Sequence, residues 1–167
     1  LFSDWKNHNK ITPAAITLPK PLTQAKVLLV NKADAIESTF AIGGLGIARN
    51  TPDLVGISVI NTILGDRFTS WLNDELRVNS GLTYGAKSQF THYSHAGSFA
   101  ISSFTKTAST VEAIDLALTT YRRLWLQGID NETLASAKAY VKGKFPPKFE
   151  TSQDLSNLLG QMYSYNF

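Results

Sequence analysis

The stretch ELRVNSGLTYG, residues 75–85, carries a charged helix end, then a glycine, then an aromatic residue that opens a strand. Leu72 lies just before it and Leu76 inside it, one helical turn apart, and residues typical of a strand follow it. Glycine is the residue that most often ends a helix, because it adopts the backbone conformation needed there. A helix therefore gives way to a strand at this point, with Arg77 and Tyr84 on either side of the turn.

Outward from this turn, the chain divides into short strand and helix patterns. Apolar or small-residue runs predict strands at 25–30 and 38–48, and a hairpin is predicted from 82–94 and 97–105. Apolar residues at helical spacing predict two helices between these strand pairs and three after them. The expected helices are 50–65, 69–77, 109–128, 130–145 and a last one that starts at Thr151.

The element order is β β α α β β α α α, which indicates an α+β fold. The connections within each strand pair are too short for parallel crossovers, so we expect a mostly antiparallel sheet with helices packed on one face. Residues 1–24 hold three prolines among polar residues, which predicts a linker from a preceding domain. Residues 25–167 are then one domain.

Composition narrows the classes of function. Lysine and arginine total 16 against 13 acidic residues, and the net charge of +3 is spread along the chain, which disfavours nucleic-acid binding. The chain has no cysteine, which excludes disulfides, thiolate catalysis and cysteine-rich zinc sites. No apolar run approaches the roughly 20 residues of a membrane-spanning helix, so no span is expected.

Catalytic motifs are missing from the sequence. It contains neither H-E-x-x-H nor the inverse pattern, and no G-x-S-x-G elbow. His92 and His95 lie three residues apart without a nearby carboxylate, so surface histidines in a turn explain them better than a metal site. Asp74 and Glu75 are adjacent on a helix and point to different sides. We therefore expect no catalytic residue and no metal ligand in this chain.

Arg77 and Tyr84 remain, and two interpretations fit them. Cations are favoured in the last turn of a helix by the helix dipole, and a tyrosine can simply pack on a sheet. Alternatively, both side chains project from one rim of the sheet. A guanidinium and a phenol placed there can donate hydrogen bonds to a peptide carbonyl or to a developing oxyanion. The spacing alone favours the first of these interpretations.

The sequence resembles the C-terminal, non-zinc half of insulinase/pitrilysin-type zinc peptidases, whose relatives include mitochondrial processing peptidase. ELRVNSGLTYG is similar to the family's E-L-R-x-x-x-G-L-x-Y segment. Other similar segments follow in the family's order and cover nearly the whole chain. They are FSDWK, VLLVNKADAIESTFAIGGLGIARNTPD, NTILGDRFTSWLNDELR and VKGKFPPKFET.

The resemblance implies an α+β domain that binds no zinc and has no activity alone. A catalytic zinc-binding domain or subunit of the same peptidase is the expected partner, with the zinc bound there, and a dimer and a peptide substrate are expected too. By resemblance, Arg77 and Tyr84 are the substrate-binding residues that reach across to the substrate backbone and orient its carbonyl. The family favours a bacterial periplasm or cell envelope. The alternative is a purely structural or assembly domain of a non-proteolytic relative.

Overall fold

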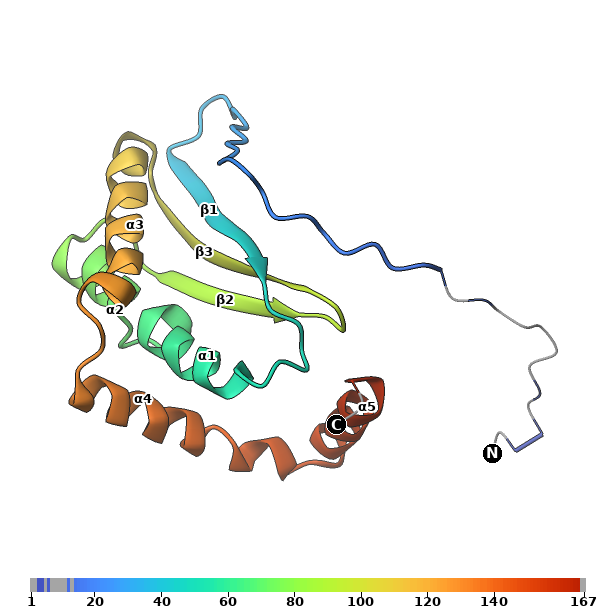
Figure 1. Ribbon diagram of the computed structural model, residues 1–167. Helices are drawn as coiled ribbons and strands as arrows, with labels where there is room; N and C mark the ends of the chain where they lie inside the picture. The colour runs from blue at the N-terminus through green and yellow to red at the C-terminus, as the bar shows by residue number, and fades with distance from the viewer. Residues whose placement is uncertain (1–2, 5, 7–11, 13, 166–167) are drawn as a thin grey trace.

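A computed structural model of the chain describes residues 3–4, 6, 12 and 14–165 (Figure 1). The sheet has three antiparallel strands in the order β1–β3–β2. The register places Ile42 of β1 opposite Ile101 of β3, and Phe90 of β2 opposite Phe99 of β3. The strands are β1 Glu37–Gly46, β2 Ala86–His92 and β3 Gly97–Lys106. The expected antiparallel sheet is confirmed.

Helical segments lie in the connection between β1 and β2 and again after β3. In the connection, two short α-helices each continue directly into a wider π-helical turn. They are α1 Leu54–Asn61 with η1 Thr62–Asp66, and α2 Trp71–Asn73 with η2 Asp74–Asn79. After β3 come η3 Thr107–Ser109, α3 Thr110–Leu126, α4 Asn131–Gly143, η4 Pro146–Phe149 and α5 Ser152–Tyr165. The α+β class is confirmed.

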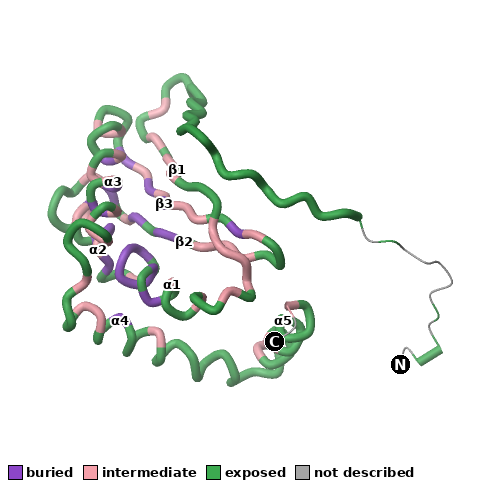
Figure 2. Tube along the Cα trace, viewed as in Figure 1, coloured by how far each residue is buried: buried purple, intermediate pink, exposed green. Residues whose placement is uncertain are grey.

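The hydrophobic core lies between one face of the sheet and the helical segments (Figure 2). Alternate residues of β2 and β3 point into it, whereas the residues between them face outward, as the pleat of a strand requires. A second, smaller cluster packs α1 and η1 against α4 around Val59, Ile63 and Ala137. The main cluster comprises Leu64, Leu72, Leu76, Ala86, Ile101 and Ala117.

Gly65 allows η1 to lie directly against the β2 strand. A Cβ atom added there would stand 2.3 Å from the Ser88 backbone nitrogen and 2.9 Å from Leu72 Cδ1. Asn61 fixes the same contact, because its Nδ2 donates to Ser88 O at 3.2 Å and its Oδ1 accepts from Ser88 Oγ at 2.7 Å. The edge of β2 is therefore tied to the helical connection, which carries Arg77.

The strand predicted at 25–30 is wrong. Residues 27–30 have no strand partner, and their side chains are 78–91% exposed. A strand needs backbone hydrogen bonds to a neighbour, and β1 pairs only with β3 in the described part of the chain. The division into a linker at 1–24 and one domain stays a prediction. The described residues of that linker are exposed and lack helix and strand, and the others lie outside the described residues.

Candidate functional site

Arg77 lies in η2 and is half-buried. Its guanidinium carbon stands over the ring of Phe68, 4.5 Å from the ring centroid. Among the described residues, no hydrogen bond or ion pair occupies its N–H groups. Glu75, the nearby carboxylate, is engaged elsewhere, because it pairs with Arg123 at 2.9 Å and accepts from Asn79 Nδ2 at 3.2 Å. The donors of Arg77 are therefore available to a ligand.

Tyr84 lies in the connection between η2 and β2, and its side chain is 82% exposed. The backbone before it is held closely. Leu76 O, within η2, accepts from the N–H groups of Leu82 at 2.9 Å and Thr83 at 3.2 Å. Gly81 makes the bend with a φ of +65°, a conformation that glycine adopts without strain. The phenol is thus an exposed group on a well-anchored connection.

The side chain of Asn73 joins the helical segment of Arg77 to the strand that follows Tyr84. Asn73 is only 8% exposed. Its Oδ1 accepts from Ala86 N–H at 3.0 Å, and its Nδ2 lies 3.3 Å from both Arg67 O and Ser70 Oγ. Asn73 comes one turn before Arg77, and Ala86 comes two residues after Tyr84. This buried amide therefore fixes the backbone near Arg77 relative to the backbone near Tyr84.

Two hydroxyl groups of β3 hold the same connection from the sheet. Ser103 Oγ lies 3.0 Å from Gly85 O, and Thr105 Oγ1 donates to Leu82 O at 2.7 Å. Both hydroxyl-bearing residues are buried. Each bond gives a buried polar group the hydrogen-bond partner that water can no longer supply. The backbone on either side of Tyr84 is therefore fixed both by the helical segment and by the sheet.

Arg77 and Tyr84 both lie outside the hydrophobic core, at the two ends of this connection. No hydrogen bond or cation–π contact joins their side chains in the part of the chain that the structure describes. Convergence of the two groups on one ligand therefore stays a prediction. The hydrogen bonds of Asn73, Ser103 and Thr105 fix the backbone between the two residues.

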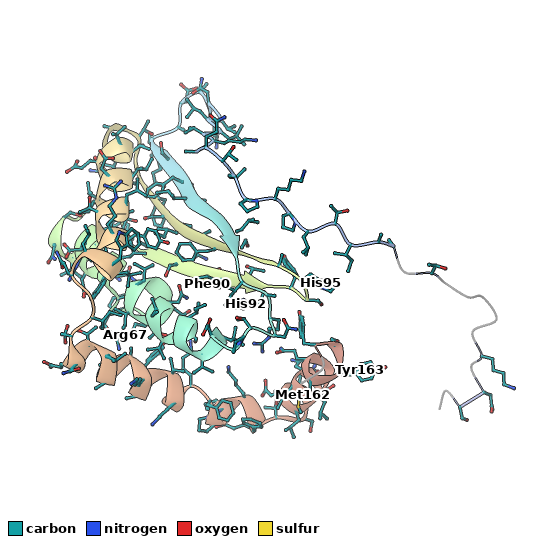
Figure 3. The ribbon with its side chains drawn as sticks, in the orientation of Figure 1. Arg67, Phe90, His92, His95, Met162 and Tyr163 are labelled. Atoms are coloured by element: carbon teal, nitrogen blue, oxygen red, sulfur yellow. The ribbon has the colours of Figure 1, made fainter. Side chains whose placement is uncertain are left out.

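His92 and His95 lie near the β2–β3 end of the sheet (Figure 3). His92 stacks on Phe90 with ring centroids 5.9 Å apart, and its Nδ1 lies 3.1 Å from Ile47 O. His95 lies in the exposed β2–β3 turn. No group of three or more His, Cys, Asp or Glu side chains within the described ranges has the arrangement to hold a metal ion. The residues that the structure describes therefore do not fit a zinc site.

An open cavity of about 360 Å³ lies between β2 and the α1–η1 segment. Asn61, Asp66, Lys87 and His92 contribute to its lining. Asp66 also stands 3.6 Å from the Lys144 ammonium. Neither Arg77 nor Tyr84 lines this cavity, so it is separate from the candidate residues. None of the helices in the described ranges has the length and apolar character needed to cross a membrane.

Sequence reasoning missed the residues that frame Arg77. Asn73 occupies a buried helical position between Leu72 and Leu76, where an apolar residue is expected. That mismatch is a usable signal, since a buried amide must find hydrogen-bond partners. Phe68 carried no such signal, because a single apolar residue near a turn has no defined neighbour in the sequence.

Comparison with known proteins gives a family match and a set of similar folds. The family described as peptidase M16 inactive domain matches residues 1–141. No curated protein matches the chain. The peptidase M16 inactive domain from Pseudomonas fluorescens is 29% identical, with a TM-score of 0.73 over 79% of this chain and 31% of that one.

Two further solved structures share the fold at lower identity. A protease from Helicobacter pylori is 21% identical, with a TM-score of 0.71 over 81% of this chain and 33% of that one. The periplasmic protease PqqL from Escherichia coli is 15% identical, with a TM-score of 0.64 over 80% of this chain and 15% of that one. The chain thus spans a third or less of the length of these three structures.

Proposed function

The chain belongs to the peptidase M16 inactive-domain family, and from this premise we propose that it serves as the substrate-positioning part of a zinc metallopeptidase. In this proposal Arg77 and Tyr84 hold a carbonyl of a peptide substrate opposite a zinc site. The zinc and its ligands belong to another domain or to a partner subunit, because the described residues offer no such ligands.

One observation carries the proposal. The guanidinium of Arg77 is held over Phe68 while its N–H groups have no protein acceptor among the described residues. The helix dipole favours a cation at this position but supplies no acceptor for its N–H groups. Glu75 binds Arg123. The donors of Arg77 are thus spared for an acceptor from outside the chain.

Positioning a substrate carbonyl requires hydrogen-bond donors, and these two side chains supply them. Arg77 and Tyr84 are both hydrogen-bond donors, and the oxygen of a peptide carbonyl accepts two such bonds. Attack on the carbonyl moves negative charge onto that oxygen, so both bonds strengthen as the reaction proceeds. Donors fixed in place before the reaction cost little reorganisation, which is why the anchored connection around Tyr84 supports the role.

The test removes each donor in the full-length protein together with its zinc-bearing domain. Tyr84→Phe removes only the hydroxyl from an exposed ring, and Arg77→Ala removes the guanidinium. Each variant is expected to lower kcat/KM for peptide hydrolysis by about 10²-fold or more. Tyr163→Phe, on a 91% exposed side chain of α5, is the matched control and should leave the rate unchanged. An unchanged kcat/KM in both donor variants rejects the proposal.

The alternative is a structural or assembly domain of a non-proteolytic relative, which has the same fold without needing free donors. H-x-x-E-H elsewhere in the protein or in a companion subunit favours the peptidase, and absence from both favours the scaffold. We further infer a peptide substrate, a dimer and a periplasmic or cell-envelope location. The periplasmic protease among the similar folds supports the location.

A further inference from the structure

We propose that Phe68 is a positioning residue for Arg77, a role that rests on the proposed function and extends it to a residue outside the turn. Phe68 lies in the connection between η1 and α2, and its side chain is 67% exposed. A large apolar side chain in that position adds little to the core. In the described part of the chain, its ring contact is with the guanidinium of Arg77, 4.5 Å from the centroid.

The contact restricts a side chain that is otherwise flexible. An arginine near the surface has several rotatable bonds, and it loses rotamer entropy when it is fixed. An aromatic ring below the guanidinium attracts the cation through its negative face. Because the N–H groups point outward along the edge of the planar guanidinium, stacking orients the group without using its donors.

Two neighbouring arginines show what a purely structural arrangement looks like in this protein. Arg123 lies 4.4 Å over Trp71, but it also pairs with Glu75. Arg67 donates to Thr69 O at 3.2 Å and to Ser136 Oγ at 2.9 Å. Both guanidinium groups thus have acceptors within the chain.

Arg77 differs, because it has the aromatic ring and no acceptor among the described residues. The ring therefore holds a cation that forms no ion pair with the described residues. A guanidinium in this state suits the carbonyl or carboxylate oxygen of a peptide.

The experiment uses the full-length protein with its zinc-bearing domain and a peptide substrate. Phe68→Leu keeps an apolar side chain but removes the ring, and Phe68→Tyr restores a ring. We expect Phe68→Leu to lower kcat about two- to five-fold with little change in KM, because the fixed guanidinium matters most in the transition state. Phe68→Tyr should keep the wild-type rate. Tyr163→Leu, at an exposed aromatic on α5, should have no effect.

The decisive measurement is the double variant. If Phe68 acts through Arg77, Phe68→Leu changes nothing further once Arg77→Ala is present. An equal loss in both backgrounds shows a general structural role and overturns the inference. No effect of Phe68→Leu, beside a large effect of Arg77→Ala, also overturns it but leaves the proposed function standing. No effect of Arg77→Ala removes the proposed function and this inference together.

Discussion

Replacing Asn73 by alanine tests whether one buried amide fixes the backbone between Arg77 and Tyr84. The substitution removes the acceptor of Ala86 N–H at 3.0 Å and the Nδ2 donor near Ser70 Oγ and Arg67 O. It keeps the helix, because alanine is the best helix former. Its effect therefore reports on the hydrogen bonds rather than on helix propensity.

The magnitude follows from what is left unpaired. A buried N–H that loses its acceptor costs roughly 1–3 kcal/mol, whereas the net loss from a satisfied bond is about 1 kcal/mol. The Ala86 bond leaves a buried donor, because Ala86 is only 4% exposed. The two contacts of Nδ2 are longer, at 3.3 Å, and contribute less. The total is about 2–3 kcal/mol of local stability.

Hydrogen exchange of the full-length protein, followed on peptides covering residues 82–92, measures this loss where it occurs. A loss of 2–3 kcal/mol raises the exchange rate of the Ala86 amide by roughly 30- to 150-fold, since each 1.36 kcal/mol is tenfold. Asn79→Ala is the control. Asn79 is an exposed asparagine in the same helical segment that donates only to Glu75, and we expect its replacement to cost less than about 0.5 kcal/mol.

Equal exchange in the Asn73→Ala and Asn79→Ala proteins would show that the buried amide does not hold the connection. Asn73 would then not fix the backbone near Arg77 relative to the backbone near Tyr84. Faster exchange confined to residues 82–92 would support this role of Asn73. Faster exchange throughout the domain would mean that Asn73 stabilises the whole fold and does not act on the connection in particular.

Two other substitutions test the packing of the helical connection and one helix cap. Gly65→Ala places a methyl group 2.3 Å from the Ser88 backbone nitrogen, so it should lower the free energy of unfolding by about 2 kcal/mol. Gly56→Ala, with open space around it, should raise the free energy of unfolding by about 0.5–1 kcal/mol. Denaturant midpoints of both variants measure these changes. Hydrogen bonds from Thr133 lower the pKa of Asp130 below its ordinary 3.8, so its stabilising effect is present above that value and is lost as the pH falls through the lowered pKa. Asp130→Asn keeps a capping oxygen that does not titrate. In melting experiments, the stability of this variant relative to the wild type should therefore rise as the pH falls from about 6 to about 2. A difference that does not change with pH would contradict the assignment.

The fold class follows from local patterns, because the strands and helices of this domain differ clearly in period. The hairpin at 82–105 and the helices after it have alternation or helical spacing that neighbouring residues reveal. The strand predicted at 25–30 rests instead on a short apolar run, and the structure has no strand there. Residues 27–30 have high β propensity, but a strand exists only where a partner supplies its hydrogen bonds. Pairing is a property of the whole sheet, and no local pattern contains it.

The π-helical turns were also beyond the reach of the sequence. Residues 62–66 and 74–79 have ordinary helical composition, and the sequence predicts plain α-helices there. The structure widens both segments at their ends, where η1 meets β2 through Gly65 and η2 carries Arg77. A π-helical turn inserts an extra residue and shifts the direction of the following side chains. The direction in which Arg77 leaves its helix is therefore set by tertiary contacts.

The candidate site itself lies between these two cases. Arg77 and Tyr84 are predicted by resemblance, whereas spacing alone favours the helix dipole as the explanation for the arginine. The dipole predicts only that a cation is tolerated at this helix end. It does not predict that Glu75, two residues away, pairs with an arginine of α3, or that an exposed phenylalanine stacks on Arg77. These two contacts leave the N–H groups of Arg77 without an acceptor among the described residues. The proposal that a peptide substrate supplies the acceptor is tested directly by the substitutions of Phe68 and Arg77.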